Sequence, residues 1–194
     1  MSVHAGCDLS RSSVPASPHR ITLKELSDPA TIQAVAYWDA LRSSRQFPSR
    51  QALSIRRMAP FLRHVALIEV LDGGGDYRFR LVGDAHVEAR GADFSGETIR
   101  EIAVRAPLFA ERSHALYDYI RMTGEPYAVR GPMAANDANW CITYRECVFL
   151  PLGAQDNLVD FILAISVYTY QAPALSVYAS EFVHRGHSDR RCGA

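Results

Sequence analysis

The stretch VDFILAISVY, residues 159–168, is apolar on both of the faces that a β-strand presents. Side chains alternate along a strand, so the larger apolar set falls on one face and consists of Val159, Phe161, Leu163, Ile165 and Val167. Ile162 and Ala164 fall on the other face. A strand that is apolar on both faces is covered on both, so we expect this one at the centre of a sheet, with a layer on each side.

Four further strand candidates precede this one in the chain. Residues 65–82 have the pattern of a β-hairpin, in which VALIEVL is followed by the turn DGGGD, whose glycines adopt positive φ easily. The return strand alternates, which predicts that Tyr77, Phe79 and Leu81 share one face. The remaining two candidates are residues 127–130 and 142–152, and the turn-rich segments around them favour antiparallel connections.

The first helix is expected to start at Asp28, whose side chain can accept a hydrogen bond from the first turn. Pro29 suits the first helical position because its missing N–H costs nothing there. The apolar stripe of this helix must pack on another surface, and it consists of Ala34, Val35, Trp38 and Leu41.

A longer helix is predicted over residues 107–123, because a proline opens it and Gly124 closes it. Shorter helical segments are expected over 84–90 and after Thr98, which can form a capping box with Glu101. The expected buried stripe of the long helix is Phe109, Leu116 and Ile120, with Arg112, Ser113 or Tyr119 at its edges.

The resulting order is a helix, two strands, several helices and three strands. Such clustering is typical of an α+β fold with an antiparallel sheet, and it differs from the alternating βα order of doubly wound folds. The expected organisation is a flexible N-terminal tail (1–20), an N-terminal helix and linker (21–60), a core (61–170) and a C-terminal tail (171–194). In that last segment at most a short helix over 175–184 is expected before a disordered end.

The composition limits the expected partners and compartment. The formal net charge is zero, so no overall field attracts nucleic acid or an anionic membrane. The N-terminus lacks the apolar run of a signal peptide, and no stretch approaches the ~20 apolar residues of a membrane span. The four cysteines form no CxxC pair. We therefore expect a cytoplasmic protein with free thiols, no nucleic acid partner and no membrane contact.

Three segments resemble a bacterial family of stand-alone PAS-like proteins. They are YWDALRSSRQFPSR (37–50), YRFRLVGDAHVEARGADFSGE (77–97) and GEPYAVRG (124–131). The family pattern is also matched by Gly83, Gly91, Asp93 and Gly96, whereas Ser95 replaces the commoner Thr. The segment ALSIRRMAP (52–60) departs as well, because an acidic linker is usual there. The resemblance covers about residues 30–170.

This resemblance implies a five-stranded antiparallel sheet in the spatial order 2-1-5-4-3, with helices on one face. The N-terminal helix is expected to cover the other face. PAS domains hold small ligands between sheet and helices, or use the sheet and a flanking helix to dimerise. The implied function is a stand-alone, non-catalytic sensory or signalling module. The alternatives are a ligand-free adaptor or dimerisation module and, more remotely, an isomerase-like enzyme.

A ligand pocket between sheet and helices would be lined by residues of the hairpin and the long helix. An alternative is that these residues simply fill a core. A pocket also needs converging polar groups. The candidate ligand-binding residues are Phe79, Leu81, His86, Arg90, Leu116, Tyr119, Ile120 and Tyr144.

No cofactor or catalytic residue is predicted. Some PAS domains bind haem through a histidine of the long helix, but His114 lies about 160° from Leu116, away from the expected buried stripe. Neither Cys141 nor Cys147 lies in a flavin-binding motif. The histidines form no metal-binding set, and the sequence contains no P-loop or nucleophile elbow. Haem and flavin are therefore disfavoured.

Two surface features leave alternatives open. The stripe residues Val35, Trp38 and Leu41 form either intrachain core or the seam of a homodimer or partner interface. The arginines around the first helix form either a patch that binds phosphate or nucleic acid, or solvated side chains with local ion pairs, and we favour the second. These arginines are Arg42, Arg45, Arg50, Arg56, Arg57 and Arg63.

Overall fold

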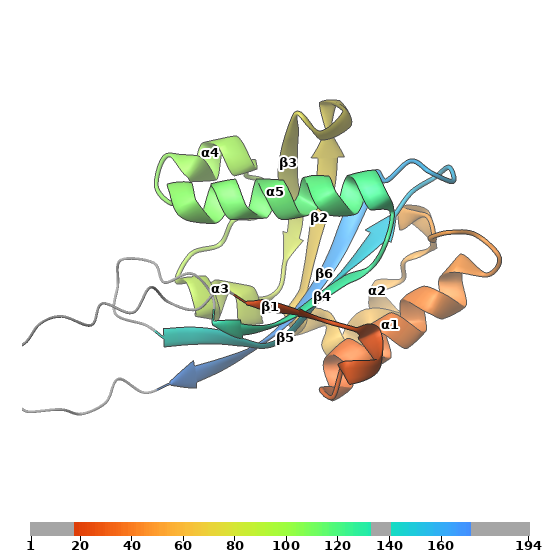
Figure 1. Cartoon of the computed structure of the whole chain (residues 1–194), viewed down its shortest axis with the longest axis horizontal. Coiled ribbons are helices and arrows are strands. Elements are labelled where there is room, and N and C mark those ends of the chain that lie inside the picture. Colours follow the sequence, from red (N-terminus) through yellow and green to blue (C-terminus); the bar gives the residue numbers. More distant parts are fainter. Residues whose placement is uncertain (1–17, 133–140, 172–194) are drawn as a thin grey trace, which may run out of the picture.

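A computed structural model describes residues 18–132 and 141–171 (Figure 1). The strands are β1 (His19–Ile21), β2 (Val65–Leu71), β3 (Asp76–Val82), β4 (Tyr127–Pro132), β5 (Cys141–Leu152) and β6 (Phe161–Gln171). The helices are α1 (Pro29–Arg42), α2 (Ile55–Met58), α3 (Asp84–Arg90), α4 (Ile99–Ala103) and α5 (Pro107–Thr123).

The strands form one antiparallel sheet in the order β1-β4-β5-β6-β2-β3. Strand β6 lies between β5 and β2, which confirms the central position predicted from its two apolar faces. The five strands β2 to β6 follow the expected order 2-1-5-4-3.

A sixth strand, β1, extends the sheet at the β4 edge and was not predicted. Its residues His19 and Arg20 fall in the segment expected to be a flexible tail, so that boundary lies too far along the chain. Strand β1 has three residues and pairs with β4 far along the chain, so no local periodicity could reveal it. The other parts of the two predicted tails, 1–17 and 172–194, lie outside the described residues.

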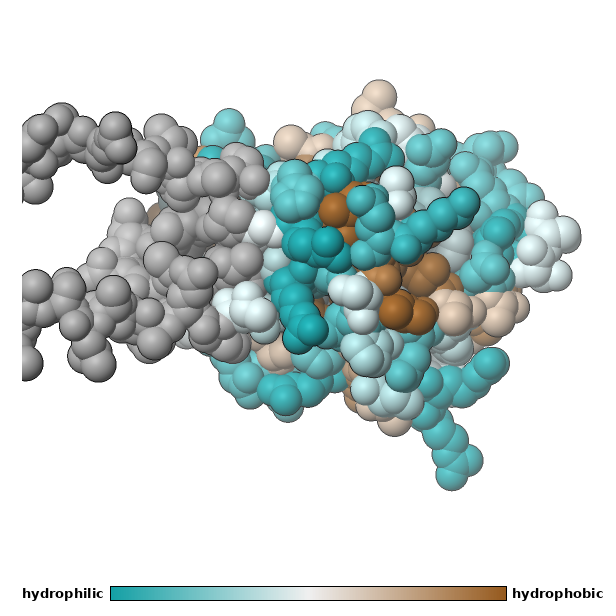
Figure 2. Space-filling view, turned by 60° about the horizontal axis from the view of Figure 1, so that its bottom comes forward, coloured by the Kyte–Doolittle hydropathy of each residue, from teal (hydrophilic) through white to brown (hydrophobic). Residues whose placement is uncertain are grey.

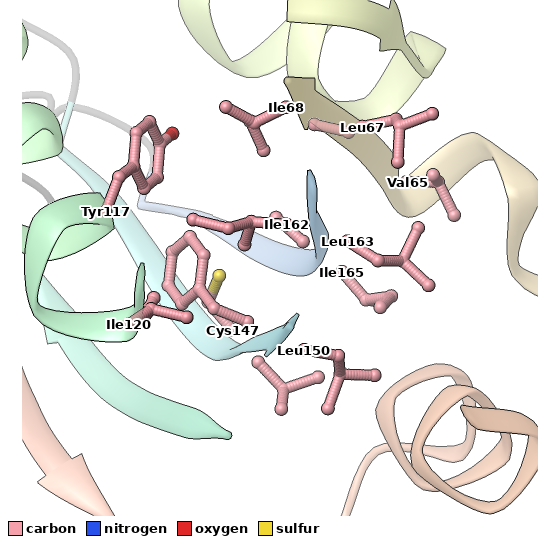
Figure 3. Close-up of a cluster of buried hydrophobic side chains, with 14 of the residues drawn as sticks. Val65, Leu67, Ile68, Tyr117, Ile120, Cys147, Leu150, Ile162, Leu163 and Ile165 are labelled. Atoms are coloured by element: carbon pink, nitrogen blue, oxygen red, sulfur yellow. The ribbon is translucent and has the colours of Figure 1, made fainter. Parts of the chain in front are cut away.

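Helices cover both faces of this sheet. Helices α3, α4 and α5 lie on one face, here called the inner face, and α1 lies on the other, the outer face (Figure 1). Figure 3 shows Val65, Leu163 and Ile165 on the side of α1, and Tyr117 and Ile120 on the side of α5. Both layers of the core are therefore built on β6 and its two neighbours.

The α1 helix starts as predicted. The side chain of Asp28 accepts a hydrogen bond from the amide of Ala30 at 2.9 Å, and Pro29 occupies the first helical position. The indole N–H of Trp38 donates to the carbonyl of Pro151 at 2.8 Å, which ties the helix to the end of β5. Trp38 is only 4% exposed, so the polar atom of a large buried ring has its partner.

A buried carboxylate, Glu146 of β5, holds the start of α1 against the sheet. It accepts hydrogen bonds from the amides of Ser27 and Asp28 at 2.8 and 2.9 Å. The hydroxyl of Thr31 donates at 2.7 Å, and the guanidinium of Arg130 at 2.8 Å. Burial by itself raises the pKa of a carboxyl group, but these donors outweigh it and bring the pKa of Glu146 to about 2.

Replacing Glu146 with Gln should lower the free energy of unfolding at pH 7 by about 3 kcal/mol. The folded pKa of Glu146 is below its ordinary value of 4.5, so its contribution is complete above pH 4.5 and is lost as the pH falls towards 2. Urea unfolding at pH 7, 5 and 3 should therefore show a difference between wild type and Glu146→Gln that shrinks with acid.

The matched control is Glu88→Gln, which breaks an exposed pair with Arg63 and should cost less than ~1 kcal/mol. A Glu146→Gln protein as stable as wild type at pH 7, or a difference independent of pH, would contradict the role given to this carboxylate.

Candidate functional site

A cavity of about 370 Å³ lies between the inner face of the sheet and α5. Residues of α3 line one end of it, and Tyr127 and Val129 of β4 lie on another side. The remaining lining residues are Pro18, Ala66, Phe79, His86, Arg90, Leu108, Phe109, Arg112, Ser113, Leu116, Tyr117, Tyr144, Phe149, Ala164 and Ser166.

The apolar wall of this cavity is largely aromatic. Phe79 of β3 packs edge-on against Tyr117 of α5, with ring centroids 6.5 Å apart. Tyr117 also contacts Phe149 of β5 at 6.2 Å. Phe109, at the start of α5, stacks on Phe94 at 5.7 Å. These contacts fix the rings, so the wall has a defined shape.

Two glycines position α3 at the cavity. Gly83 precedes the helix and bonds to the carbonyl of Val65, and a Cβ there would lie 2.4 Å from the carbonyl oxygen of Arg63. Gly91 follows the helix with φ of 67°, a left-handed conformation that ends the helix after Arg90. The close approach at one end and the sharp stop at the other bring His86 and Arg90 to the cavity.

His86 is buried and has a fixed tautomer. Its Nε2 lies 2.8 Å from the carbonyl oxygen of His64, which can only accept, so Nε2 carries the proton. Its Nδ1 therefore accepts from the hydroxyl of Tyr168 at 2.9 Å. Burial, and then the charge of Arg90, lower the pKa of His86 to about 3. His86 is thus a neutral group of the cavity wall at physiological pH.

Arg90 brings a positive charge to the cavity. Its Nη2 donates to the hydroxyl of Tyr144 at 3.1 Å, and its guanidinium lies 4.1 Å from the ring centre of Phe109. Within residues 18–132 and 141–171, no carboxylate lies within 4.0 Å of its nitrogens. Burial raises the pKa values of the nearby phenols of Tyr117, Tyr144 and Tyr168, which are therefore neutral at pH 7.

A second arginine, Arg112 of α5, also lines the cavity, and its side chain is exposed. It forms no ion pair with any residue in the described part of the chain. Asp and Glu are absent from the described lining residues. The cavity is therefore apolar over most of its wall and positively charged where α3 and α5 meet it.

Five of the eight predicted ligand-binding residues line the cavity. The structure brings together Phe79, His86, Arg90, Leu116 and Tyr144. The other three predicted residues, Leu81, Tyr119 and Ile120, are not among its lining residues.

Leu81 is on the outer face because of an irregularity in the β2–β3 ladder. Leu67 pairs with Leu81 but the next residue, Ile68, pairs with Phe79, which leaves Arg80 as an extra residue on β3. Such a bulge reverses the alternation, so Phe79 and Leu81 do not share the face that strict period 2 predicts.

On α5 the predicted buried stripe is displaced by one residue at Phe109 and Leu116, whereas Ile120 is buried as predicted. Ile120 is fully buried in the core, and Tyr119 is 38% exposed and accepts a hydrogen bond from Arg20 of β1 at 3.0 Å. The observed buried stripe is Ala110, Ser113, Tyr117 and Ile120. Its spacing of three and four residues was readable in the sequence, and it would have identified Tyr117 and Ser113 as cavity residues.

The three residues predicted to form an interface lie on α1. Trp38 packs on its own sheet, while Val35 and Leu41 are half-buried against the same core. In Figure 2 the face brought forward is largely hydrophilic, with brown areas in small groups. An interface formed by these three residues stays a prediction, and Trp38 could join one only if α1 moved from the sheet.

The arginines around α1 mostly have local partners, as the favoured alternative predicts. Arg42 pairs with Asp39, Arg45 with Asp156, and Arg63 with Glu88. Arg50 and Arg57 lie over the rings of Phe161 and Tyr37.

His114 of α5 lies outside the cavity, and no metal-binding group forms among the described residues. His114 lies 3.2 Å from Asp118 and edge-on to Tyr77, and it is not one of the cavity-lining residues. Among the described residues, no group of three His, Cys, Asp or Glu side chains is arranged to hold a metal. In the same part of the chain, no helix is both long and apolar enough to span a bilayer.

The imidazole of His86 should stay neutral at pH 5, with its proton on Nε2. Protonation would place a buried positive charge beside Arg90 and would break the hydrogen bond from Tyr168. Long-range ¹H–¹⁵N spectra of the imidazole between pH 7.5 and 5 measure this directly, and His86→Gln assigns the signal. Titration of that signal with a midpoint near 6.5 would contradict the buried geometry.

Comparison with known proteins places this fold in a family. A family model described as PAS domain matches residues 26–164, which include all of the sheet except β1 and the end of β6. No curated protein and no solved structure matches the chain. PAS domains are in general sensory or interaction modules. With most of its length matched, and with the central strand and strand order described above, the chain belongs to the PAS domain family.

Proposed function

We propose that this protein is a non-catalytic sensory module that binds a small molecule in the cavity between the sheet and α5. The observation that carries this proposal is a cavity of about 370 Å³ that polar groups from two helices and three strands line. Ligand sites in proteins commonly have volumes of roughly 300–1,000 Å³ and combine apolar walls with a few polar groups.

The choice of residues on β2 and β6 supports a built cavity over an accidental packing gap. The floor of the cavity includes the small residues Ala66, Ala164 and Ser166. On the outer face of β6, under α1, the corresponding positions are the large residues Leu163 and Ile165. Core packing leaves few voids larger than a water molecule, so a row of small residues opposite a bulky helix keeps space open.

Binding would affect several elements at once, which is what a sensor requires. The cavity wall includes side chains of α3, of α5 and of the central strands β5 and β6. A ligand that contacts both helices would favour one spacing between them and the sheet, and only by its difference in affinity for the two arrangements. The signal would then leave the domain through a protein partner or through self-association.

The replacement Leu116→Trp should fill the cavity and abolish ligand retention. Leu116 is half-buried and lines the cavity from α5, so a larger ring there takes the ligand's space. Native mass spectrometry of the purified chain should show a retained small molecule in wild type and its loss in the variant. The control is Met122→Trp on the same helix, where the side chain is 76% exposed and a Trp meets solvent.

A wild-type protein that repeatedly carries no small molecule, and that no compound in a metabolite library stabilises against heat, would contradict the proposal. In that case the chain would act as a ligand-free adaptor or dimerisation module.

A further inference from the structure

On the basis of that function, we propose that the ligand is a small amphipathic anion, and that Arg90, assisted by Arg112, binds its oxyanion head group. The head group is a carboxylate or a phosphate monoester, because the guanidinium fork matches both. The apolar part of the ligand would lie against Phe79, Leu116 and Phe149.

The positive charge of Arg90 has no counter-charge among the described residues. Burying a guanidinium costs free energy unless an opposite charge or a full set of acceptors compensates it. Burial by itself disfavours the charged form of Arg90, but the surrounding phenols of Tyr144, Tyr168 and Tyr117 and the hydrogen bond to Tyr144 outweigh it and raise its pKa, so Arg90 stays charged. These phenols are neutral at pH 7, as argued above, so the described chain gives Arg90 no counter-charge. An anionic ligand would supply one.

The geometry of the guanidinium supports the same assignment. Tyr144 receives one hydrogen bond from Nη2, and the ring of Phe109 supports the guanidinium at 4.1 Å. A guanidinium has five N–H donors, and no other acceptor for Arg90 occurs among the described residues. The group is therefore held in place by a phenol and an aromatic ring while donors remain for a ligand, which is the preorganisation that binding sites use.

The charge balance of the cavity wall supports it as well. Its described residues include two arginines, no Asp, no Glu and no Lys, and His86 is neutral. A cationic ligand would meet uncompensated positive charge here, and a neutral one would leave the half-buried Arg90 without a counter-ion. The volume of about 370 Å³ and the aromatic wall require in addition an apolar body, so inorganic phosphate or acetate alone would bind weakly.

The test compares matched ligands on the full chain. Hexanoate, octanoate, decanoate, phenylacetate and octyl phosphate are titrated by calorimetry and by thermal shift, each beside its neutral amide or alcohol, with octylamine as the cation. At least one acid should bind about tenfold or more tightly than its neutral counterpart, which is the scale of a charge-assisted hydrogen bond. Comparing octanoate with octyl phosphate identifies the preferred head group.

Substitutions locate the head group. Arg90→Met should remove the preference for the acid, Arg90→Lys should restore part of it, and Arg112→Met should weaken acid binding several-fold. Arg56→Met, an exposed arginine that does not line the cavity, should change nothing. If Arg90→Met fails to fold, the Arg112 variant and the acid-to-amide ratio on wild type decide the matter.

The outcomes separate the two proposals. Equal binding of acid and amide, tighter binding of octylamine, or an acid preference that survives Arg90→Met would overturn the anion assignment and leave ligand binding intact. If no titrated compound binds, the molecule retained in native mass spectrometry decides: an acid supports the assignment, and a neutral or cationic molecule overturns it. No retained molecule and no binding of any kind would overturn both.

Discussion

The coverage of β6 on both faces is the constraint on which the rest of this structure depends. A central strand with large apolar side chains on its outer face needs a cover there, and α1 provides it. Hydrogen bonds hold α1 to the sheet at two places. The Glu146 carboxylate accepts them from the start of α1, and the Trp38 indole donates one to the end of β5. These contacts add to the apolar packing of α1, and Leu163 and Ile165 are fully buried.

The inner face of the same strands borders the cavity. Small residues on β2 and β6 leave space between the sheet and α5, and the aromatic rings of Phe79, Tyr117 and Phe149 surround that space. Into this apolar space α3 brings Arg90, which the described residues leave without a counter-ion. An uncompensated charge in a preformed apolar cavity destabilises the folded protein without its ligand. The proposed anionic ligand would compensate this charge and so stabilise the complex.

Much of the fold could be predicted from the sequence because the relevant signals are local. Two apolar faces identified the centre of the sheet, and Asp28 with Pro29 marked the start of α1. Glycines bounded α3, and a proline and a glycine bounded α5. Long-range pairing was not readable in this way, which explains why β1 was missed. The bulge that turns Leu81 to the outer face likewise depends on the partner strand, because period 2 holds only while the ladder is regular.

The site was predictable in part, for similar reasons. Residue type and element order brought Phe79, His86 and Arg90 to the expected cavity, whereas the exact face of α5 depends on one helical position. The charge of the cavity could not be read from the sequence at all, because the absence of an acid near Arg90 is a property of the assembled fold.

The most direct test of this account is a crystal structure of the chain with the tightest-binding acid of the titration series. The account predicts that the oxyanion lies within hydrogen-bonding distance of the Arg90 guanidinium, inside the cavity, with the apolar body between α5 and the sheet. An acid bound elsewhere on the surface, or a cavity filled by the protein's own side chains, would contradict it.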